Sequence, residues 1–467
     1  TFHKLYLEVG GKLFDDFHAS RVLPGFDPNN KINILLSIKE RSEIVIAINS
    51  NDIKNRKIRN DLGITYDVEV ERLIRTFVSM GLEVNSVVFS FYEPNVEVDK
   101  FMRKLKRMKI QTYKHYKIAG YPQDASLIVS DNGLGKNEYI KTTKDIVIVT
   151  APGPGSGKMA TCLSQLYHDK KNGIISGYAK YETFPVWNLA LNHPVNVAYE
   201  AATVDLNDIN MIDPYHLDAY GASSVNYNRD IDVFPLLRNI FTNIYGQCIY
   251  KSPTDMGINM VGMAIGDNEE ISKAANDEII RRYYQTRKDV LLGKLEEDSA
   301  TRCEMLLNRS GLSIKNRKVV ESANQKALEV DAPAIAIQLH NGKIITGKRS
   351  KLLSQCAATI LNALKELAGI NDNIPLLSPS VIEPIRSLKV DSLHNENPII
   401  HAQEILIALA IQANTNPLAD MALKKIPELA NCEAHASCLI NDNDLRLFNR
   451  MGIRITEEPI SLLFKIN

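Results

Sequence analysis

The sequence predicts an α/β protein of several domains, and three features indicate this fold class. Its 467 residues, 45% of them hydrophobic, suffice for about three domains with cores of their own. Strand and helix patterns alternate along the first part of the chain, as in a parallel sheet covered by helices. A glycine-rich loop then joins a buried strand to a helix, which is typical of phosphate-binding proteins. We therefore expect a Rossmann-like phosphate- or nucleotide-binding domain over residues 1–265, a helical domain over 266–331 and a C-terminal α+β domain over 332–467.

The expected elements of the N-terminal domain follow one another in strand and helix order. Apolar, β-branched runs predict strands, and apolar residues at helical spacing predict helices. In chain order we expect strands at Glu43–Asn49, from Ser86, at Ile110–Tyr116, at Ser126–Asp131, at Asp145–Thr150 and from Gly173, with helices at Asp67–Met80, Asp99–Met108 and Met159–Tyr167. Ligands bind such sheets at the carboxyl ends of strands, so Asp131–Lys136 and the loop from Ala151 are expected to line one crevice. Taken alone, Asp131–Lys136 is better explained as a surface turn.

The loop between Thr150 and Met159, APGPGSGK, is predicted to bind an anion. Glycine allows positive φ and a close approach of the backbone, so that successive N–H groups and the next helix N-terminus point at the anion. Lys158 adds a full positive charge. The residues expected to contact the phosphate are Gly153, Gly155, Ser156, Gly157 and Lys158. The alternative is a tight strand-to-helix turn without a ligand.

This loop matches the nucleotide-binding P-loop, G-x-x-x-x-G-K-[ST], only in part. Pro152 replaces the first glycine, and Met159 replaces the Ser or Thr that would hold magnesium. A thioether is a poor ligand for a hard cation that prefers oxygen. Thr161 does not substitute, because two further helical residues turn a side chain by about 200°. The phosphate cradle is therefore predicted more securely than the metal site.

A polar cluster near the start of the chain is a second candidate site. In FDDFHASRVLP, the residues Asp15, His18 and Arg21 are three apart and would share one helix face. A histidine beside a carboxylate makes a general base, and an arginine offers a planar fork for phosphate or carboxylate. Salt bridges on a solvated helix explain the same residues. We expect acid–base and substrate contacts here.

Acidic residues downstream of the loop are candidates for the missing metal ligands. Asp205 and Asp208 are spaced for one helical face and could hold magnesium. A solvated acidic loop is the alternative.

The rest of the chain predicts two further structural parts. Residues 268–330 read as amphipathic helices broken by turns at Gly293 and Gly311, and suit a spacer or a dimerisation arm. From Ala334 a hairpin is expected, with a type I′ turn at Asn341-Gly342, then a helix at Leu352–Leu367 and a strand before Ser378. This order is similar to a cytidine-deaminase-like fold, but SPSVIEP carries no P-C-x-x-C and the helix start has no H-x-E, so its zinc chemistry would be absent.

Charge and cysteine content exclude several classes. Lys plus Arg and Asp plus Glu are 55 each, which gives no general attraction for nucleic acid or acidic membranes. No apolar run is long enough to span a membrane, there is no signal-peptide pattern, and six scattered cysteines suit a reducing compartment, so a cytoplasmic protein is expected. In C-x-x-H-x-x-C, a strand would point His435 away from Cys432 and Cys438, so no zinc is expected.

Three long blocks identify a family resemblance. The blocks are GGKLFDDFHASRVLPGF from Gly10, TAPGPGSGKMATCLSQLYH from Thr150 and YETFPVWNLALNHPVNVAYEAATVDLND from Tyr181. Together they resemble a bacterial family known only as domain of unknown function 1846, over nearly the whole chain. The resemblance implies no mechanism. Members have sometimes been labelled ATP-dependent zinc proteases, but no H-E-x-x-H is present to support that label.

These observations predict a cytoplasmic enzyme that binds ATP or GTP with magnesium, or another phosphorylated small molecule, and catalyses phosphate-linked transfer, ligation or hydrolysis. Lys158 would stabilise phosphoryl charge. One alternative is a transferase or isomerase acting on a phosphorylated metabolite without NTP hydrolysis, and another is a non-catalytic nucleotide sensor. A homo-oligomer is expected, with neither nucleic acid nor membrane as partner.

Overall fold

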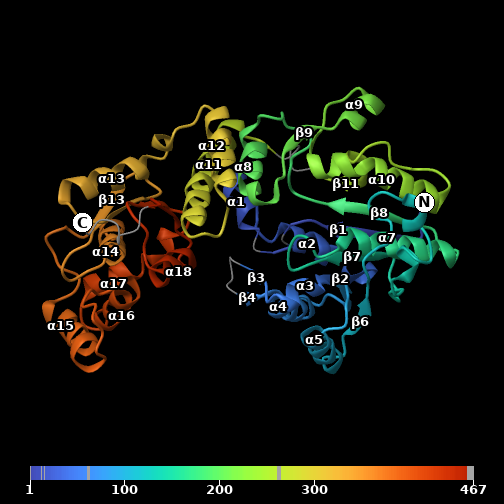
Figure 1. Cartoon of the computed structure of the whole chain (residues 1–467). Helices are drawn as coiled ribbons and strands as arrows, with labels where there is room; N and C mark the ends of the chain where they lie inside the picture. The colour runs from blue at the N-terminus through green and yellow to red at the C-terminus, as the bar shows by residue number, and fades with distance from the viewer. Residues whose placement is uncertain (1, 12, 15, 60–63, 260–264, 460–467) are drawn as a thin grey trace. The chain divides into compact units, whose positions relative to one another are not determined.

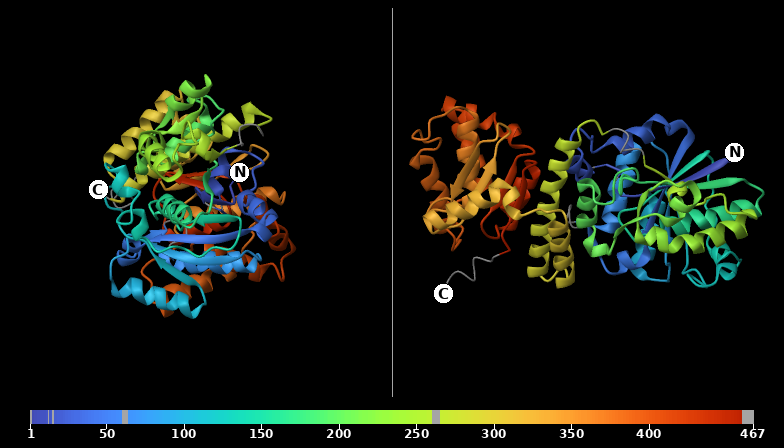
Figure 2. Two further views of the ribbon diagram at one scale, coloured as in Figure 1. Left: turned by 90° about the vertical axis from the view of Figure 1, so that its right-hand side faces the viewer. Right: turned by 90° about the horizontal axis from the view of Figure 1, so that it is seen from above.

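The structure is a computed structural model that describes residues 2–11, 13–14, 16–59, 64–259 and 265–459. The chain forms two compact units, Thr1–Ala275 and Asn276–Asn467, whose boundary lies inside helix α11 (Asn268–Leu291). Figure 1 labels their elements, and Figure 2 shows the ribbon from two further sides.

The first unit is built on a seven-stranded sheet in which every neighbouring pair is parallel. Its strand order is β11-β8-β1-β7-β2-β5-β6, so the strand before the glycine-rich loop lies between the first two strands of the chain (Figure 1). The strands are β1 (Lys4–Val9), β2 (Ser42–Asn49), β5 (Val84–Ser90), β6 (Gln111–Lys114), β7 (Ile146–Thr150), β8 (Ser176–Tyr181) and β11 (Gly257–Ile258). The parallel sheet predicted from the alternating pattern is confirmed.

Helices cover both faces of this sheet. One core joins Ile44, Ile46 and Ile48 of β2 to α2, α4 and α5, and the other joins Val147 and Val149 of β7 to α6, α7 and α10. Alternate residues of each strand face the two cores, as the two-residue period of a strand requires. The helices of this unit are α1 (Phe17–Val22), α2 (Asn30–Ser37), α3 (Ser50–Lys54), α4 (Tyr66–Ser79), α5 (Val96–Arg107), α6 (Ala125–Ile128), α7 (Lys158–Lys171), α8 (Pro194–Ala202), α9 (Pro214–Tyr220) and α10 (Asn228–Tyr245).

One predicted strand of the first unit is wrong. The segment Ser126–Asp131 contributes to helix α6 instead, because the Asp124 carboxylate accepts a hydrogen bond from Leu127 N at 2.9 Å and caps the first turn. The apolar run in this segment serves the core as a helix face, and Ile128 is its buried residue. A short apolar run does not by itself distinguish a strand from a buried helix. Two small antiparallel pairs, β3 (Ile58–Arg59) with β4 (Ile64–Thr65) and β9 (Asn210–Ile212) with β10 (Val225–Tyr227), complete the strands described in this unit.

The second unit packs helices on both faces of a four-stranded sheet of order β13-β12-β14-β15. Its large core lies between this sheet and α14, α16, α17 and α18, and a smaller one lies under α13. The pairs β12–β13 and β12–β14 are antiparallel, and β14–β15 is parallel. The further elements are α12 (Glu297–Arg309), α13 (Lys318–Val330), β12 (Ala334–Gln338), β13 (Ile344–Lys348), α14 (Gln355–Leu367), α15 (Pro379–Ser387), α16 (Ala402–Gln412), α17 (Pro417–Leu423), β14 (Glu433–Ala436), α18 (Asp442–Arg450) and β15 (Arg454–Glu457).

The predicted helices over 268–330, the hairpin and the helix ending at Leu367 are confirmed. The type I′ turn is wrong, because only Gly342 of the Asn341-Gly342 pair has a positive φ, 84°. The strand expected before Ser378 is also wrong, since residues 370–378 form turns and irregular chain. The cytidine-deaminase-like arrangement stays a prediction.

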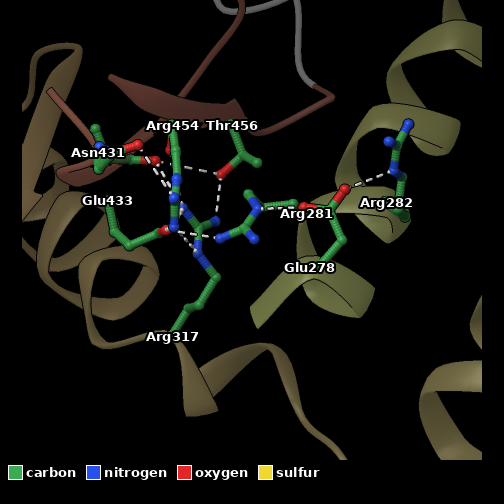
Figure 3. A network of polar contacts seen from close by, with 9 residues as sticks. Glu278, Arg281, Arg282, Arg317, Asn431, Glu433, Arg454 and Thr456 are labelled. Atoms are coloured by element: carbon green, nitrogen blue, oxygen red, sulfur yellow. Dashed lines mark hydrogen bonds and ion pairs between the residues drawn. The ribbon is translucent and has the colours of Figure 1, made fainter. Parts of the chain in front are cut away.

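A buried ionic network holds α11 and α13 on the sheet of the second unit (Figure 3). The Glu433 carboxylate on β14 lies 2.6 Å from Arg281 Nη1, 2.8 Å from Arg317 Nη2 and 3.6 Å from Arg454 Nη1. Arg281 also pairs with Glu278, at 2.7 Å. Burial alone would raise the pKa of Glu433, but the three guanidinium groups hold it below its usual range.

We predict that Glu433→Gln destabilises the protein by about 3–5 kcal/mol, because it leaves buried guanidinium groups without an ionised partner. The free energy of unfolding is measured by urea denaturation. Glu428→Gln is the control, since the exposed Glu428 pairs with Lys425 at the surface, and its loss costs about 0–1 kcal/mol. Equal effects of the two variants would contradict the role given to the network.

Candidate functional site

The glycine-rich loop lies where the sheet changes the direction of its connections. The chain leaving β1 and β2 packs α2 and α4 on one face, whereas the chain leaving β7, between those strands, packs α7 on the other. Adjacent strands whose connections diverge in this way leave a crevice at their carboxyl ends, and ligands of open α/β sheets bind in such crevices. The loop therefore occupies the position that this architecture reserves for ligands.

Two glycines of the loop are required by close packing. A Cβ on Gly153 would lie 2.3 Å from Tyr66 Oη, and a Cβ on Gly157 would lie 2.7 Å from Ser90 Cβ. Gly155 and Gly157 also have positive φ, 73° and 85°, as the sequence predicted. The backbone conformation is therefore one that other residues would disrupt.

Side chains from neighbouring strands fix the carbonyl groups of the loop. Ser90 at the end of β5 donates to the Ser156 carbonyl at 2.9 Å, and Asn49 at the end of β2 donates to the Gly155 carbonyl at 3.2 Å. The Ser156 hydroxyl donates to the Gly153 carbonyl at 2.8 Å. The Ser156 side chain thus stabilises the loop itself, and only its N–H remains for a ligand.

The N–H groups of residues 155–160 have no hydrogen-bond acceptor among the described residues. These residues end the loop and form the first turn of α7, whose cap, Gly157, has no side chain to satisfy them. Unsatisfied N–H groups at a helix N-terminus favour a bound anion. Among the described residues, six N–H groups are thus left unsatisfied at one helix N-terminus.

Lys158 begins α7 and is half-buried. Its ammonium group has no ion pair within the described part of the chain. It lies close enough to Cys162 to oppose the rise in that thiol's pKa, which burial drives. Thr161 donates its hydroxyl proton to the Gly157 carbonyl at 3.0 Å, one turn earlier in the chain.

A buried ionic cluster lies beside the loop, at the carboxyl ends of β1 and β8. Glu8 pairs in register with Lys180 on one side and with Val149 of β7 on the other. Lys180 Nζ lies 2.5 Å from Asp230 Oδ2 on α10 and 3.5 Å from Glu182 Oε1. Glu8, Lys180 and Asp230 are each less than 9% exposed. Two carboxylates therefore pair with one ammonium group, and Glu8 lies close enough to raise the pKa of that group, in a site that excludes most water.

Tyrosines complete this cluster. Tyr178 donates to Glu8 at 2.7 Å, and Tyr227 donates to both Glu182 oxygens at 2.8 Å. Burial raises the pKa of Asp230 to about 6; the contact with Lys180 lowers it and the neighbouring Glu182 raises it. Burial opposes the charge on Lys180, but Asp230, Glu182 and Glu8 hold its pKa above its ordinary value. The sequence analysis missed Glu8, although a single carboxylate inside the apolar strand KLYLEV was a usable signal.

The predicted cluster near the chain start is described in part. His18 and Arg21 lie on helix α1, which confirms the helix, while Asp15 lies outside the described residues. The His18 ring packs 5.2 Å from the Phe184 ring and 6.1 Å from the Tyr199 ring, measured between centroids. Burial raises the pKa of Tyr199, as do Glu182 and Asp208, so the histidine lies beside the β8 end of the site.

The two aspartates proposed for magnesium do not share a helix face. Asp205 lies in a 3-10 turn, Val204–Leu206, and Asn207 then takes a left-handed φ of 57°, which ends the turn. Asp208 is buried, and its carboxylate is 2.9 Å from Arg229 Nε. In the described ranges, no group of three or more His, Cys, Asp or Glu side chains is placed to hold a metal ion. Magnesium binding here stays a prediction.

The segment Asp131–Lys136 does not line the crevice of the loop. Asp131 accepts hydrogen bonds from Lys171 at 2.5 Å and Tyr167 at 2.9 Å. Both partners lie in the C-terminal half of α7, about 14 Å (Tyr167) and about 20 Å (Lys171) along the helix from Lys158. The shared crevice predicted for the two segments is therefore wrong, because α6 replaces the expected strand.

Comparison with known proteins gives matches over almost the entire chain. A family model described as "Domain of unknown function DUF1846, N-terminal" matches residues 1–311, and its C-terminal counterpart matches residues 315–462. Proteins named UPF0371 protein from Streptococcus pneumoniae strains JJA and CGSP14 are each 52% identical over 456 residues, which cover 98% of this chain and 92% of theirs. Separately, none of the helices in the described residues combines the length and the apolar character needed to cross a bilayer.

The raised pKa of Asp230 predicts a stability that depends on pH. The folded state binds this proton more tightly than the unfolded chain, whose carboxyl has a pKa near 3.8. The stability contributed by the group is therefore complete below that value and is lost as pH rises towards about 6, by up to about 3 kcal/mol. We expect Asp230→Asn to remove this part of the pH dependence in urea unfolding between pH 4 and 7. The exposed Asp232 on the same helix is the control, and a slope equally unchanged in Asp230→Asn and Asp232→Asn would refute the assignment.

Proposed function

The chain belongs to the family described as domain of unknown function DUF1846, and from this starting point we propose that it is an enzyme that binds the phosphate of a small ligand at residues 153–158. One observation carries the proposal: at the topological switch point, neighbouring side chains fix the loop carbonyls while the N–H groups of residues 155–160 and the Lys158 ammonium have no partner among the described residues. A bound anion would accept hydrogen bonds from these N–H groups and would also pair with the ammonium group.

A nucleotide, ATP or GTP, is the ligand that the partial P-loop pattern favours. Its phosphates would lie on the N–H groups of residues 155–160, with Lys158 against the developing phosphoryl charge. Magnesium, where present, would come bound to the nucleotide, with Asp205 and Asp208 as the proposed protein ligands.

A phosphorylated metabolite used without magnesium is the second candidate, and two features favour it. Met159 occupies the position of the metal-binding hydroxyl, and the Thr161 hydroxyl is bonded to the Gly157 carbonyl. The protein would then act as a transferase or isomerase without hydrolysing NTP.

Chemistry on the bound ligand is proposed for the ionic cluster at the ends of β1 and β8. Asp230, with its raised pKa, can hold or release a proton near neutral pH, and Lys180 supplies a fixed positive charge. His18 and Arg21 are proposed as substrate contacts at the β8 side of this cluster. Glu8 shares a sheet register with Val149, so the cluster lies one strand away from the phosphate loop.

We predict that Lys158→Ala abolishes the thermal stabilisation of the protein by its phosphorylated ligand while leaving the melting temperature of the free protein unchanged. The side chain has no intramolecular ion pair in the described part of the chain, so its removal costs the fold little. The measurement is a thermal-shift screen of nucleotides and phosphorylated metabolites, each with and without magnesium.

Lys170→Ala is the matched control, because it removes the same charge from the exposed C-terminal end of the same helix. A shift with ATP or GTP that grows with magnesium supports the nucleotide enzyme, and a shift with another phosphate that is independent of magnesium supports the second candidate. Ligand binding without product formation would identify a sensor. An identical thermal shift with ligand in Lys158→Ala and in the wild type would contradict the proposal.

A further inference from the structure

An open cleft of about 790 Å³ lies on the second unit. One wall comes from the segment that follows strand β13, and the other comes from α15 and the chain after it. The residues that line the cleft are Arg349, Lys351, Leu352, Arg386, Glu396, Asn397, Pro398 and Ile399.

The cleft has a surplus of positive charge. Arg349, Lys351 and Arg386 carry three positive charges, against the single carboxylate of Glu396. Arg386 is partly neutralised by Glu383, 2.8 Å away. Neither the Arg349 nor the Lys351 side chain has an ion pair or hydrogen bond to any described residue. A net positive field therefore remains at the cleft.

The first wall is a tight turn that holds its two cations on either side of Ser350. The Ser350 hydroxyl accepts hydrogen bonds from Leu353 N at 2.9 Å and Leu352 N at 3.2 Å. Ser350 N in turn donates to the Leu353 carbonyl at 2.9 Å. This arrangement fixes the backbone at Arg349 and Lys351 before any ligand arrives, which lowers the entropy cost of binding.

The second wall is hydrogen-bonded to the first wall and to the buried side chain of Lys389. Ile400 N donates to the Leu352 carbonyl at 2.9 Å, and Leu353 forms an isolated β-bridge with Ile400. The buried Lys389 donates to the Ile399 carbonyl at 2.6 Å and pairs with Glu404 at 3.0 Å. Lys389 lies in a π-helical turn, Leu388–Ser392, a rare conformation that is frequent at functional sites.

We propose that this cleft binds a small organic anion that carries phosphate or carboxylate groups. Two arginines offer planar forks that match either group, and the unpaired Lys351 adds a point charge. The volume suits a small molecule. A single-stranded nucleic acid is disfavoured, because none of the described residues lining the cleft is aromatic and could stack a base. All the residues that line the cleft belong to the second unit.

The test is isothermal titration of the full chain with pyrophosphate and, separately, with citrate at low ionic strength. We expect Arg349→Ala/Lys351→Ala to weaken binding about tenfold or more, and added salt to weaken wild-type binding, since the cleft is open to solvent. Lys315→Ala/Lys318→Ala is the control, because it removes two exposed positive charges of the same unit that do not line the cleft.

Titration of Lys158→Ala separates this site from the loop, since the cleft affinity should be unchanged there. If the cleft variant loses affinity for pyrophosphate alone, the ligand is a phosphate. If it loses affinity for citrate alone, the ligand is a carboxylate. Equal affinities of the cleft variant and the control variant overturn the proposal. Absence of binding by both probes in the wild type, with the chain folded by circular dichroism, overturns it as well.

Discussion

The position of one strand determines most of what the first unit can do. Strand β7 enters the sheet between β1 and β2, whose connections already cover one face, so the chain after β7 packs its helix on the other. That crossing opens the sheet edge at the carboxyl end of β7 and directs the N-terminus of α7 towards it. The contacts to the loop follow from the same placement. Ser90 and Asn49 reach the loop because β5 and β2 end on that side. Gly157 is needed because Ser90 leaves no room for a Cβ, and Gly153 is needed because Tyr66 leaves none.

The sequence was most informative where local chemistry and fold agree. Backbone conformation is determined locally by the apolar strand before Ala151, by the glycines of the loop and by the helix without Gly or Pro after Lys158. Strand β7, the positive φ angles and α7 were therefore predictable. The segment Ser126–Asp131 was not, because a short apolar run packs equally well as a strand or as a helix face, and the cap from Asp124 decided between them. Because this segment is a helix, the neighbouring Asp131 lies against the C-terminal part of α7 and not in the expected crevice.

The ionic cluster beside the loop illustrates a different limit of sequence reasoning. Glu8, Lys180 and Asp230 come from three distant segments, and only the sheet register and the packing of α10 bring them together. Periodicity assigns each residue to an element but says nothing of which strands become neighbours. Asp205 and Asp208 show the reverse case, since their spacing suggested a shared helix face that the left-handed Asn207 interrupts. Spacing is a reliable guide to proximity only inside a continuous regular element.

The ionic groups around Glu433 and around Asp230 differ in the sign of their excess charge. In the second unit, Glu433 is surrounded by three guanidinium groups, which keep it ionised across the usual pH range. Such a site holds its charges fixed and joins α11 and α13 to β14. In the first unit, Asp230 and Glu182 pair with one ammonium group beside Glu8, and the pKa of Asp230 rises towards neutrality. The stability that Asp230 contributes at low pH is lost as its proton leaves, so the arrangement contributes little to the fold near neutral pH. Such an arrangement at a strand end beside the glycine-rich loop is expected where proton transfer is useful, and this is the physical reason for proposing the ionic cluster as the place of any chemistry.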